Sequence, residues 1–451
     1  MTHSRFKLFP VAAAAVLAIA SCANEEEVQL PPSGNEIRFT TRVSRATETD
    51  LAVLQKSEGF KVYADVDDWT NFFINGDTAR YDGTSAAFVL NKKYNWSSDM
   101  KKIQFWAFHP IDDKIVKPEI SASNIRIDDF TPVASLTKPY NVGSFTNAGP
   151  GQSDLIIAYT EAEFGKVSNN AVPLNFQHAL AQVEVKIKNA EASTDGRKIV
   201  KIAGACIVNA KNKGNLEFHA HDADATAADD SRFTITDLND SKYDIVWNTA
   251  SATLASYGQA LLGDVKLNVA PGSESYVISN DNKDNSSLML VPQKTTKYNF
   301  STPNEGSYIL LLCRVEIHHP GETHTGTKTE TTTGGTVGSD GKGGHIHQLF
   351  PELQSGDTYN EKAYGYTCVP VDFDWKPGLR HIYHLNFLGT SAGAGQYPPT
   401  DHPAIKVDGS INVTPKPDDK EPGDLVLDNP ITFTVTVAEW KDADQTPTPM
   451  P

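Results

Sequence analysis

The residues of this chain that could undergo chemistry are a cysteine near the N-terminus and two arginines shortly after it. Cys22 follows Ile19-Ala20-Ser21 directly, and this arrangement is a lipobox, the sequence that a lipoprotein signal peptidase cuts before an acylated cysteine. Arg42 and Arg45 precede peptide bonds that a trypsin-like protease could cut. We expect acylation at Cys22 and proteolysis between Arg45 and Ala46, with Arg42 as the alternative site.

The segment before the cysteine has the composition of a targeting signal. Arg5 and Lys7 give a positive start, and the apolar stretch from Leu8 to Ala20 is shorter than the roughly 20 residues that a membrane-spanning helix needs. We therefore expect residues 1–22 to be a lipoprotein signal peptide and the mature chain to be tethered to a membrane by acyl chains. An ordinary secretory signal with an unrelated cysteine is the alternative.

Histidines in the second half of the chain could in principle bind a transition metal. They are His318, His319, His324, His345 and His347, and they flank a stretch rich in Gly and Thr. Imidazole is a good ligand for zinc, nickel and copper, but no cysteine or carboxylate stands at a recognised ligand spacing. We expect residues 319–347 to form an exposed loop, with no metal site and no cofactor.

The sequence contains no motif typical of catalysis. Nucleophile-elbow, zinc-protease, P-loop and dinucleotide-binding patterns are missing. The paired carboxylates Asp67-Asp68 and Asp112-Asp113 lie beside turn-forming residues and are typical of turns. The six tryptophans could line a sugar-binding platform, but most lie in strand patterns, where core packing is the simpler interpretation. We expect the protein not to be an enzyme.

Charge and cysteine content limit the partners further. The 451 residues carry a formal net charge of −16, which argues against nucleic acid as a partner because nucleic acid requires clustered basic residues. Besides Cys22 the chain has three cysteines, Cys206, Cys313 and Cys368, so at most one disulfide could form among them. Free, buried cysteines that act as small apolar side chains are the simpler interpretation.

Strand patterns dominate the rest of the sequence. Short runs rich in Val, Ile, Phe, Tyr and Thr alternate with clusters of turn residues, which predicts a mostly-β fold of sandwich type. Ile103–Phe108 is apolar at nearly every position and suits a strand covered on both faces, and Tyr308–Ile317 predicts a long core strand. A linker-like stretch at 165–172 separates two expected domains, residues 46–170 and residues 171–413.

One pattern occurs at both ends of the chain. The first copy has Ile37, Phe39 and Val43 on one side of a strand, and the second copy has Ile431, Phe433, Val435 and Val437. Residues 23–45 then form a tether and a first strand that cleavage at Arg45 would remove. Residues 414–451 form a linker and a candidate donor strand. The stretch 414–430 is rich in Pro, Asp and Lys, and we expect it to be too polar to pack.

These features together resemble the fimbrillin family, the subunits of the type V pili of Bacteroidota. The matching segments, in the family's order, are the lipobox, the Ile37-x-Phe39 strand, Arg45-Ala46, Tyr94-Asn95-Trp96, Phe105–Pro110, Asp154–Ala158, Leu174–Ala181, Leu290–Gln293, Trp375–Gly378 and Val435–Trp440. The acidic run Glu25–Glu27 resembles a surface-export signal of lipoproteins from the same bacteria, and a solvated tether is the alternative. The loop after His319 has no match to the family.

The resemblance implies two transthyretin-like β-sandwich domains in tandem and no catalysis. It also implies export to the cell surface as an outer-membrane lipoprotein, removal of the first strand by a protease, and assembly with other pilus subunits by strand exchange. The polymer could contain one kind of subunit or several, and a host protein or glycan could be the receptor. Stalk and accessory roles fit this chain, since it shows no added adhesive domain.

The physics of β-sheets supports this interpretation and leaves one alternative. Loss of the first strand would expose an apolar groove and unpaired backbone groups, which the last strand of another subunit could fill. Alternatively, residues 431–437 are simply the last strand of their own sandwich. The protein would then be a surface lipoprotein that acts as an adhesin or binds glycans without forming a polymer.

Overall fold

The computed structural model describes most of the chain and confirms the expected mostly-β architecture. The described residues are 35–43, 51–66, 72–100, 102–111, 117–121, 124–132, 140–141, 154–191, 198–220, 232–234, 243–260, 267–270, 272–278, 288–319, 338–339, 345–353, 359–389, 392–405, 407, 409–427 and 429–439. Among these residues, helix is limited to α1 (Leu51–Lys56) and a short 3-10 turn (Ser168–Asn170). Within the same residues, no helix has the length and apolarity required to cross a membrane.

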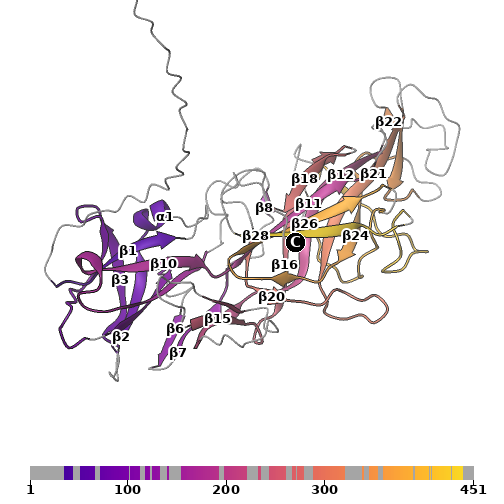
Figure 1. The fold of residues 1–451 in the computed structure, drawn as a ribbon. Coiled ribbons are helices and arrows are strands. Elements are labelled where there is room, and N and C mark those ends of the chain that lie inside the picture. The colour runs from indigo at the N-terminus through magenta and orange to yellow at the C-terminus, as the bar shows by residue number, and fades with distance from the viewer. Residues whose placement is uncertain are drawn as a thin grey trace, which may run out of the picture.

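The first part of the chain closes into a β-barrel (Figure 1). In pairing order, its strands are β1 (Arg38–Val43), β10 (Ala171–His178), β9 (Ile156–Ala162), β5 (Ile103–His109), β2 (Phe60–Val66), β3 (Ile74–Asp82) and β4 (Ala87–Leu90). Strand β5 pairs with β2 on one side and β9 on the other, and its side chains are nearly all buried. This burial agrees with the apolar run seen in the sequence.

Two sheets form the second part of the fold (Figure 1). One contains β18 (Glu274–Ile278), β11 (Ala181–Asn189), β26 (Leu379–Phe387) and β28 (Thr432–Glu439), with β19 (Leu288–Leu290) paired to β11. The other contains, in pairing order, β22 (Gly338–Ser339), β23 (His345–Phe350), β21 (Tyr308–His319), β12 (Lys198–Lys211), β16 (Leu254–Ala260) and β8 (Tyr140–Asn141). In the same sheet β17 (Leu267–Val269) pairs with β12, β24 (Ala363–Pro370) pairs with β21, and β27 (Asn412–Val413) pairs with β24. Their apolar side chains share one core, as in a β-sandwich.

A further sheet lies between the barrel and the sandwich (Figure 1). Its strands are β14 (Arg232–Thr234), β15 (Tyr243–Asn248), β13 (Gly214–Ala220), β7 (Asn124–Phe130) and β6 (Lys117–Ser121), and the pair β20 (Gln293–Lys294) with β25 (Asp374–Trp375) lies beyond it. Phe108 of the barrel, Phe218 of this sheet and Met289 of the sandwich belong to one buried cluster. The barrel and the sandwich are therefore joined by a common apolar core.

The strand pairing bears on where the two expected domains meet. Strand β10 begins at Ala171, directly after the expected boundary, and pairs with β1 and β9 of the barrel. The sheet between the two parts pairs β7, from the first expected domain, with β13 from the second. The first three-dimensional unit therefore extends past residue 170, and the chain crosses between the units more than once.

Candidate functional site: two strands with one pattern

Strand β1 lies in the barrel wall, and its apolar side chains pack into the core together with Ile37, which directly precedes the strand. Ile37 is 1% exposed and Phe39 is 0% exposed. The Phe39 ring packs edge-on against Phe60 and Phe105, with ring centres 6.1 and 5.7 Å apart. Val43 is half-buried against the same core. Removal of β1 would therefore open a groove that leads into the barrel core.

The hydrogen bonding of β1 is unequal on its two sides. It runs parallel to β10 along its whole length, from Arg38 opposite Ala171 to Val43 opposite Phe176. On the other side it pairs with β4 at Arg38 and Phe39 only. A strand that replaced β1 would therefore find its main hydrogen-bonding edge along β10.

One polar atom on the inner face of β1 is poorly accommodated. Alternation along the strand places Thr41 on the same face as Phe39 and Val43. The Thr41 hydroxyl oxygen is buried, and no described residue forms a hydrogen bond with it. A buried hydroxyl without a partner loses its hydration and gains nothing in return. Among the described residues, this hydroxyl is therefore the one inward-facing polar group of the strand that lacks a hydrogen bond.

Strand β28 carries the same pattern but occupies an edge. It pairs antiparallel with β26, from Thr432 opposite Asn386 to Glu439 opposite Leu379, and it ends the order β18-β11-β26-β28 of its sheet. Ile431, just before it, is buried at 4% exposure. Phe433 and Val435, however, are 37% and 40% exposed. The last strand is thus fully paired on one side and poorly buried.

The arm before β28 is packed, so the expectation that residues 414–430 would not pack is wrong. The Gly423 amide donates to the Tyr397 carbonyl, and the Val426 amide donates to the Gly395 carbonyl, both at 2.8 Å. Val426 is 2% exposed. Backbone hydrogen bonds rather than apolar content hold this arm in place, and composition gave no signal of them.

Of the residues expected to be acylated or cut, only Arg42 lies among the described residues. Cys22, Arg45 and Ala46 lie outside the described residues. Arg42 lies on β1 itself, with an exposed side chain opposite Asn175 of β10. A cut after Arg42 would therefore leave Val43 on the body of the protein, whereas a cut after Arg45 would release the whole strand.

The histidines expected to flank a loop lie on two paired strands, β21 and β23. His318 lies opposite Ile346 and His319 opposite His345, while His347 is 6% exposed. His324 is outside the described residues. Within the part of the chain that the structure describes, no group of three His, Cys, Asp or Glu side chains is arranged to hold a metal ion.

The cysteines and tryptophans of the described residues are core side chains. Cys206, Cys313 and Cys368 are buried and unpaired. Burial raises the pKa of the Cys206 thiol to about 12, so this thiol stays protonated and unreactive at neutral pH. The described tryptophans, Trp96, Trp106, Trp247 and Trp375, are all at least nine-tenths buried and offer no exposed platform to a sugar ring.

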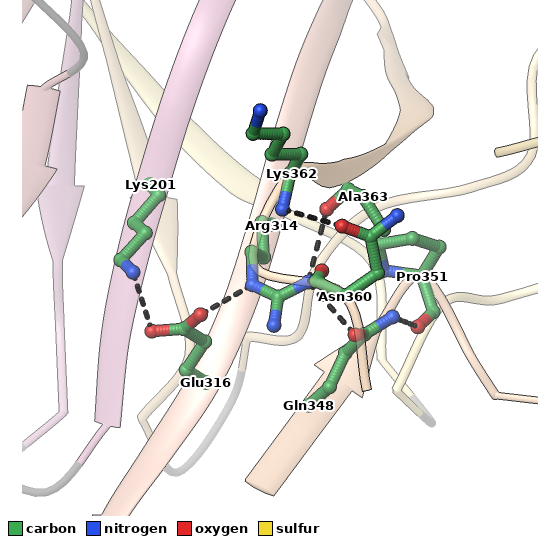
Figure 2. Close-up of polar contacts among 8 residues, drawn as sticks. All are labelled: Lys201, Arg314, Glu316, Gln348, Pro351, Asn360, Lys362 and Ala363. Carbon is green, nitrogen blue, oxygen red and sulfur yellow. Dashed lines mark hydrogen bonds and ion pairs between the residues drawn. The ribbon is translucent and has the colours of Figure 1, made fainter. Parts of the chain in front are cut away.

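A buried ionic cluster crosses the larger sheet of the sandwich (Figure 2). Arg314 and Glu316 on β21 are both 0% exposed and pair with each other, and Lys201 of β12 contacts Glu316 at 2.7 Å. Arg314 Nη1 also donates to the Gln348 side chain of β23 and to the Asn360 carbonyl, both at 2.8 Å. The cluster thus connects three neighbouring strands and the segment that follows them. The sequence predicted a core strand here but gave no signal of this network.

A cavity of about 510 Å³ lies where the arm crosses β24. Its walls include Phe350, Tyr366, Tyr397, His402 and five prolines, at positions 351, 398, 399, 415 and 417. The volume falls within the range of small-ligand sites, and the walls are mainly apolar. This cavity is separate from the groove that β1 fills.

Comparison with known proteins adds sequence evidence to this geometry. A family model described as fimbrillin-like matches residues 41–339. A curated relative, the fimbrium subunit Fim1C of Phocaeicola vulgatus, is 24% identical over 199 residues, which are 39% of this chain and 49% of the relative. The chain thus spans about half the length of this relative.

Solved structures give weaker likenesses. A fimbrial protein from Bacteroides vulgatus has a TM-score of 0.44 and 13% identity, with 90% of this chain and 100% of that chain covered. A fimbrial protein from Bacteroides ovatus has a TM-score of 0.26 and 13% identity, with 54% of this chain and 47% of that chain covered. The likeness to the fimbrillin-like family therefore lies in the sequence match over residues 41–339.

Proposed function

Because the fimbrillin-like model matches more than half of the sequence, the chain belongs to the fimbrillin-like family, as the motifs suggested. From this premise we propose that the protein is a structural subunit, of the stalk or accessory type, of a cell-surface fimbrium. The subunit is exported as a lipoprotein, loses its first strand to an Arg-specific protease, and polymerises by donating its last strand.

The observation that carries the proposal is the opposite burial of two matching strands. Phe39 of β1 is 0% exposed, whereas Phe433 of β28, at the same place in the pattern, is 37% exposed. A strand whose Phe433 and Val435 are more than one third exposed at a sheet edge gains apolar burial when it moves into a closed wall. The groove of β1 has the alternation that this strand requires.

The energies are large enough for a stable contact. Burial of a large apolar side chain contributes roughly 1.5–3 kcal/mol, so the groove positions of Ile37, Phe39 and Val43 together contribute about 5–9 kcal/mol before entropy losses. The incoming strand also restores hydrogen bonds along β10. Since the donor strand and the groove are different surfaces of one subunit, the contact is head-to-tail, and it gives a filament when successive rotations do not close into a ring.

Before assembly, the lipid on Cys22 would hold the subunit at the outer membrane and display it at the cell surface. Cleavage between Arg45 and Ala46 would then separate the subunit from this anchor and free the first strand to leave the groove. Cleavage after Arg42 is the alternative, and it would leave Val43 behind.

N-terminal sequencing of the surface-exposed protein, together with an SDS gel run without boiling, tests the proposal. A mature start at Ala46 and an SDS-resistant ladder are expected. Phe433→Asp should abolish the ladder while the circular dichroism of the subunit stays unchanged. A start at lipidated Cys22 with monomer only would contradict the proposal.

The second candidate function is a surface adhesin that does not polymerise. It is favoured by the complete pairing of β28 with β26 and by the cavity under the arm, which could accept a glycan or a host protein side chain. In that case Phe433→Asp would unfold the subunit, and Tyr366→Ala in the cavity would reduce cell attachment without altering any ladder.

A further inference from the structure

We infer that the cavity where the arm crosses β24 is a binding site for neutral carbohydrate, and that a sugar ring lies there against Tyr366 and His402. This inference goes beyond strand donation and does not depend on it, because neither of the two matching strands lines the cavity. A subunit that polymerises and one that does not would bind the sugar equally. The volume of about 510 Å³ falls within the roughly 300–1,000 Å³ of small-ligand sites.

The walls of the cavity are ordered before a ligand arrives. Five of the wall residues are prolines, in which the side-chain ring fixes the φ angle. The Tyr366 hydroxyl accepts a hydrogen bond from the Ile405 amide at 2.9 Å, which holds the Tyr366 ring in one direction. Tyr397 and Phe350 are both buried, and their ring centres lie 6.2 Å apart. A site with such walls loses little conformational entropy when it binds a ligand.

One wall of the cavity presents a pair of aromatic rings. The rings of Tyr366 and His402 have centres 4.4 Å apart and planes tilted by 53°. Both side chains are half-buried, so a ligand in the cavity can reach them. A sugar ring carries C–H groups on its faces, and their slight positive charge is attracted to the negative face of an aromatic ring. A sugar ring that lies on this wall directs the hydroxyl groups at its edge toward the rest of the cavity.

Two wall residues can donate hydrogen bonds to a ligand. The Lys416 ammonium group donates to the Pro417 carbonyl at 3.1 Å and also to the Lys420 carbonyl. An ammonium group has three N–H bonds, so the third can serve a ligand oxygen. The two backbone contacts also fix the position of the positive charge. Thr400, an exposed wall residue, has a hydroxyl that can donate or accept.

Two other wall residues can accept hydrogen bonds. The Nδ1 atom of His402 lies 3.0 Å from the Pro403 carbonyl oxygen. Because a carbonyl oxygen only accepts, Nδ1 carries the proton, and Nε2 of the neutral ring is an acceptor. The carboxylate of Asp418, an exposed wall residue, also accepts. The cavity therefore presents both donors and acceptors, and a hydroxyl group can satisfy either kind.

Charge and hydrogen bonding together favour neutral carbohydrate over other ligands. Among the described wall residues, Lys416 and Asp418 contribute one positive and one negative charge, and neutral His402 adds none. Burial raises the pKa of Tyr397 to about 12, so this phenol is also uncharged at neutral pH. A proline-rich peptide packs against aromatic walls as well, but its prolines have no N–H groups. It would leave the His402 and Asp418 acceptors without donors, whereas sugar hydroxyls supply them.

Saturation-transfer NMR on the uncut full chain tests the site. The probes are the methyl glycosides of glucose, galactose, mannose, fucose and N-acetylglucosamine, and a hexaproline peptide represents the competing class of ligand. At least one glycoside should bind, with the strongest transfer at the C–H groups of one ring face. Binding of the peptide alone, or of no probe at all, would overturn the inference. Since no strand is removed and no ladder is measured, either result leaves the proposed strand donation intact.

A blocked cavity is the second test. Val413 of β27 is a wall residue and is 41% exposed, whereas its exposed neighbour Asn412 is not a wall residue. Alternation along the strand directs the two side chains to opposite faces. Val413→Trp should weaken glycoside binding by about tenfold or more, and Asn412→Trp should change the Kd by less than about twofold. Neither change replaces a buried side chain, and circular dichroism checks that both variants fold. Equal glycoside binding by the two variants would place the sugar outside the cavity and overturn the inference.

Discussion

Strands β1 and β28 have the same apolar alternation but very different surroundings. Strand β1 lies between β10 and β4 in a closed wall, and its Phe39 is 0% exposed. Strand β28 has β26 on one side and ends its sheet, and its Phe433 is 37% exposed. Alternation therefore predicts which face of a strand is apolar, whereas the number of neighbouring elements decides how much of that face is buried.

The largest expected effect on stability is at Phe39, the enclosed counterpart of Phe433. Phe39→Ala should destabilise the barrel by about 3–5 kcal/mol, because it removes a fully buried ring and leaves a cavity. Urea unfolding of the full chain, with hydrogen exchange of the β10 amides as the readout, would measure this loss of stability. Retention of β10 protection in the variant would show that β1 contributes little to the barrel, and the comparison would fail.

Acidification should weaken the sheet that holds β28. Burial lowers the pKa of His381 on β26 to about 4, and its Nε2 accepts a hydrogen bond from the Lys376 amide at 3.0 Å. The unfolded chain, with a histidine pKa near 6.5, takes up this proton first, so stability falls by about 3 kcal/mol as the pH drops from about 6.5 to about 4.

Denaturant unfolding at several pH values within this window measures the loss. His381→Gln retains an acceptor for Lys376 without titrating, so its stability should vary less with pH in this window. An identical pH dependence in the variant and the natural chain would assign the acid sensitivity to other groups. His381 lies opposite Val437, so this test separates the β28 side of the molecule from the β1 side.

A smaller effect, a gain in stability rather than a loss, is expected at Thr41. Thr41→Val should stabilise the uncut subunit by about 1 kcal/mol, because it removes a buried hydroxyl that no described residue satisfies. The melting temperature should rise, and ladder formation after cleavage should slow because the resident strand is held more tightly. Thr40→Val, on the outward face, is the matched control. A fall in melting temperature for Thr41→Val would show that the hydroxyl has a partner.

The smallest effect on the isolated subunit is expected at Phe433. Phe433→Ala should change the free energy of unfolding by less than about 1 kcal/mol, since the ring is 37% exposed at an edge. The same urea experiment as for Phe39→Ala measures it. A loss comparable to that of Phe39→Ala would mean that β28 is an integral strand of its own sandwich, which is the adhesin alternative.

The sequence allowed much of the secondary structure to be predicted. The apolar run at 103–108 was expected to be covered on both faces, and β5 lies between β2 and β9 with nearly all of its side chains buried. The run at 308–317 was expected to be a core strand, and β21 is one. Such runs are reliable because their side chains have no alternative to burial.

Two features of the second half were missed for physical reasons. Arg314 and Glu316 appear in the sequence as polar positions of a strand, and partners that are distant in sequence, among them Lys201 and Gln348, make their burial tolerable. The arm at 414–430 has few apolar residues, and its order comes from backbone hydrogen bonds to the segment around Tyr397. Neither set of partners is close in sequence, so neither could be found by local pattern.

The sequence by itself determined that this protein is built from strands, that it belongs with the fimbrillins, and that its first and last strands share one pattern. Only the tertiary structure decided that one copy of the pattern is enclosed and the other lies at an edge, and that the Thr41 hydroxyl is buried with no hydrogen-bond partner among the described residues. Side-chain alternation is a local property of the chain, whereas burial depends on which distant segments cover each face.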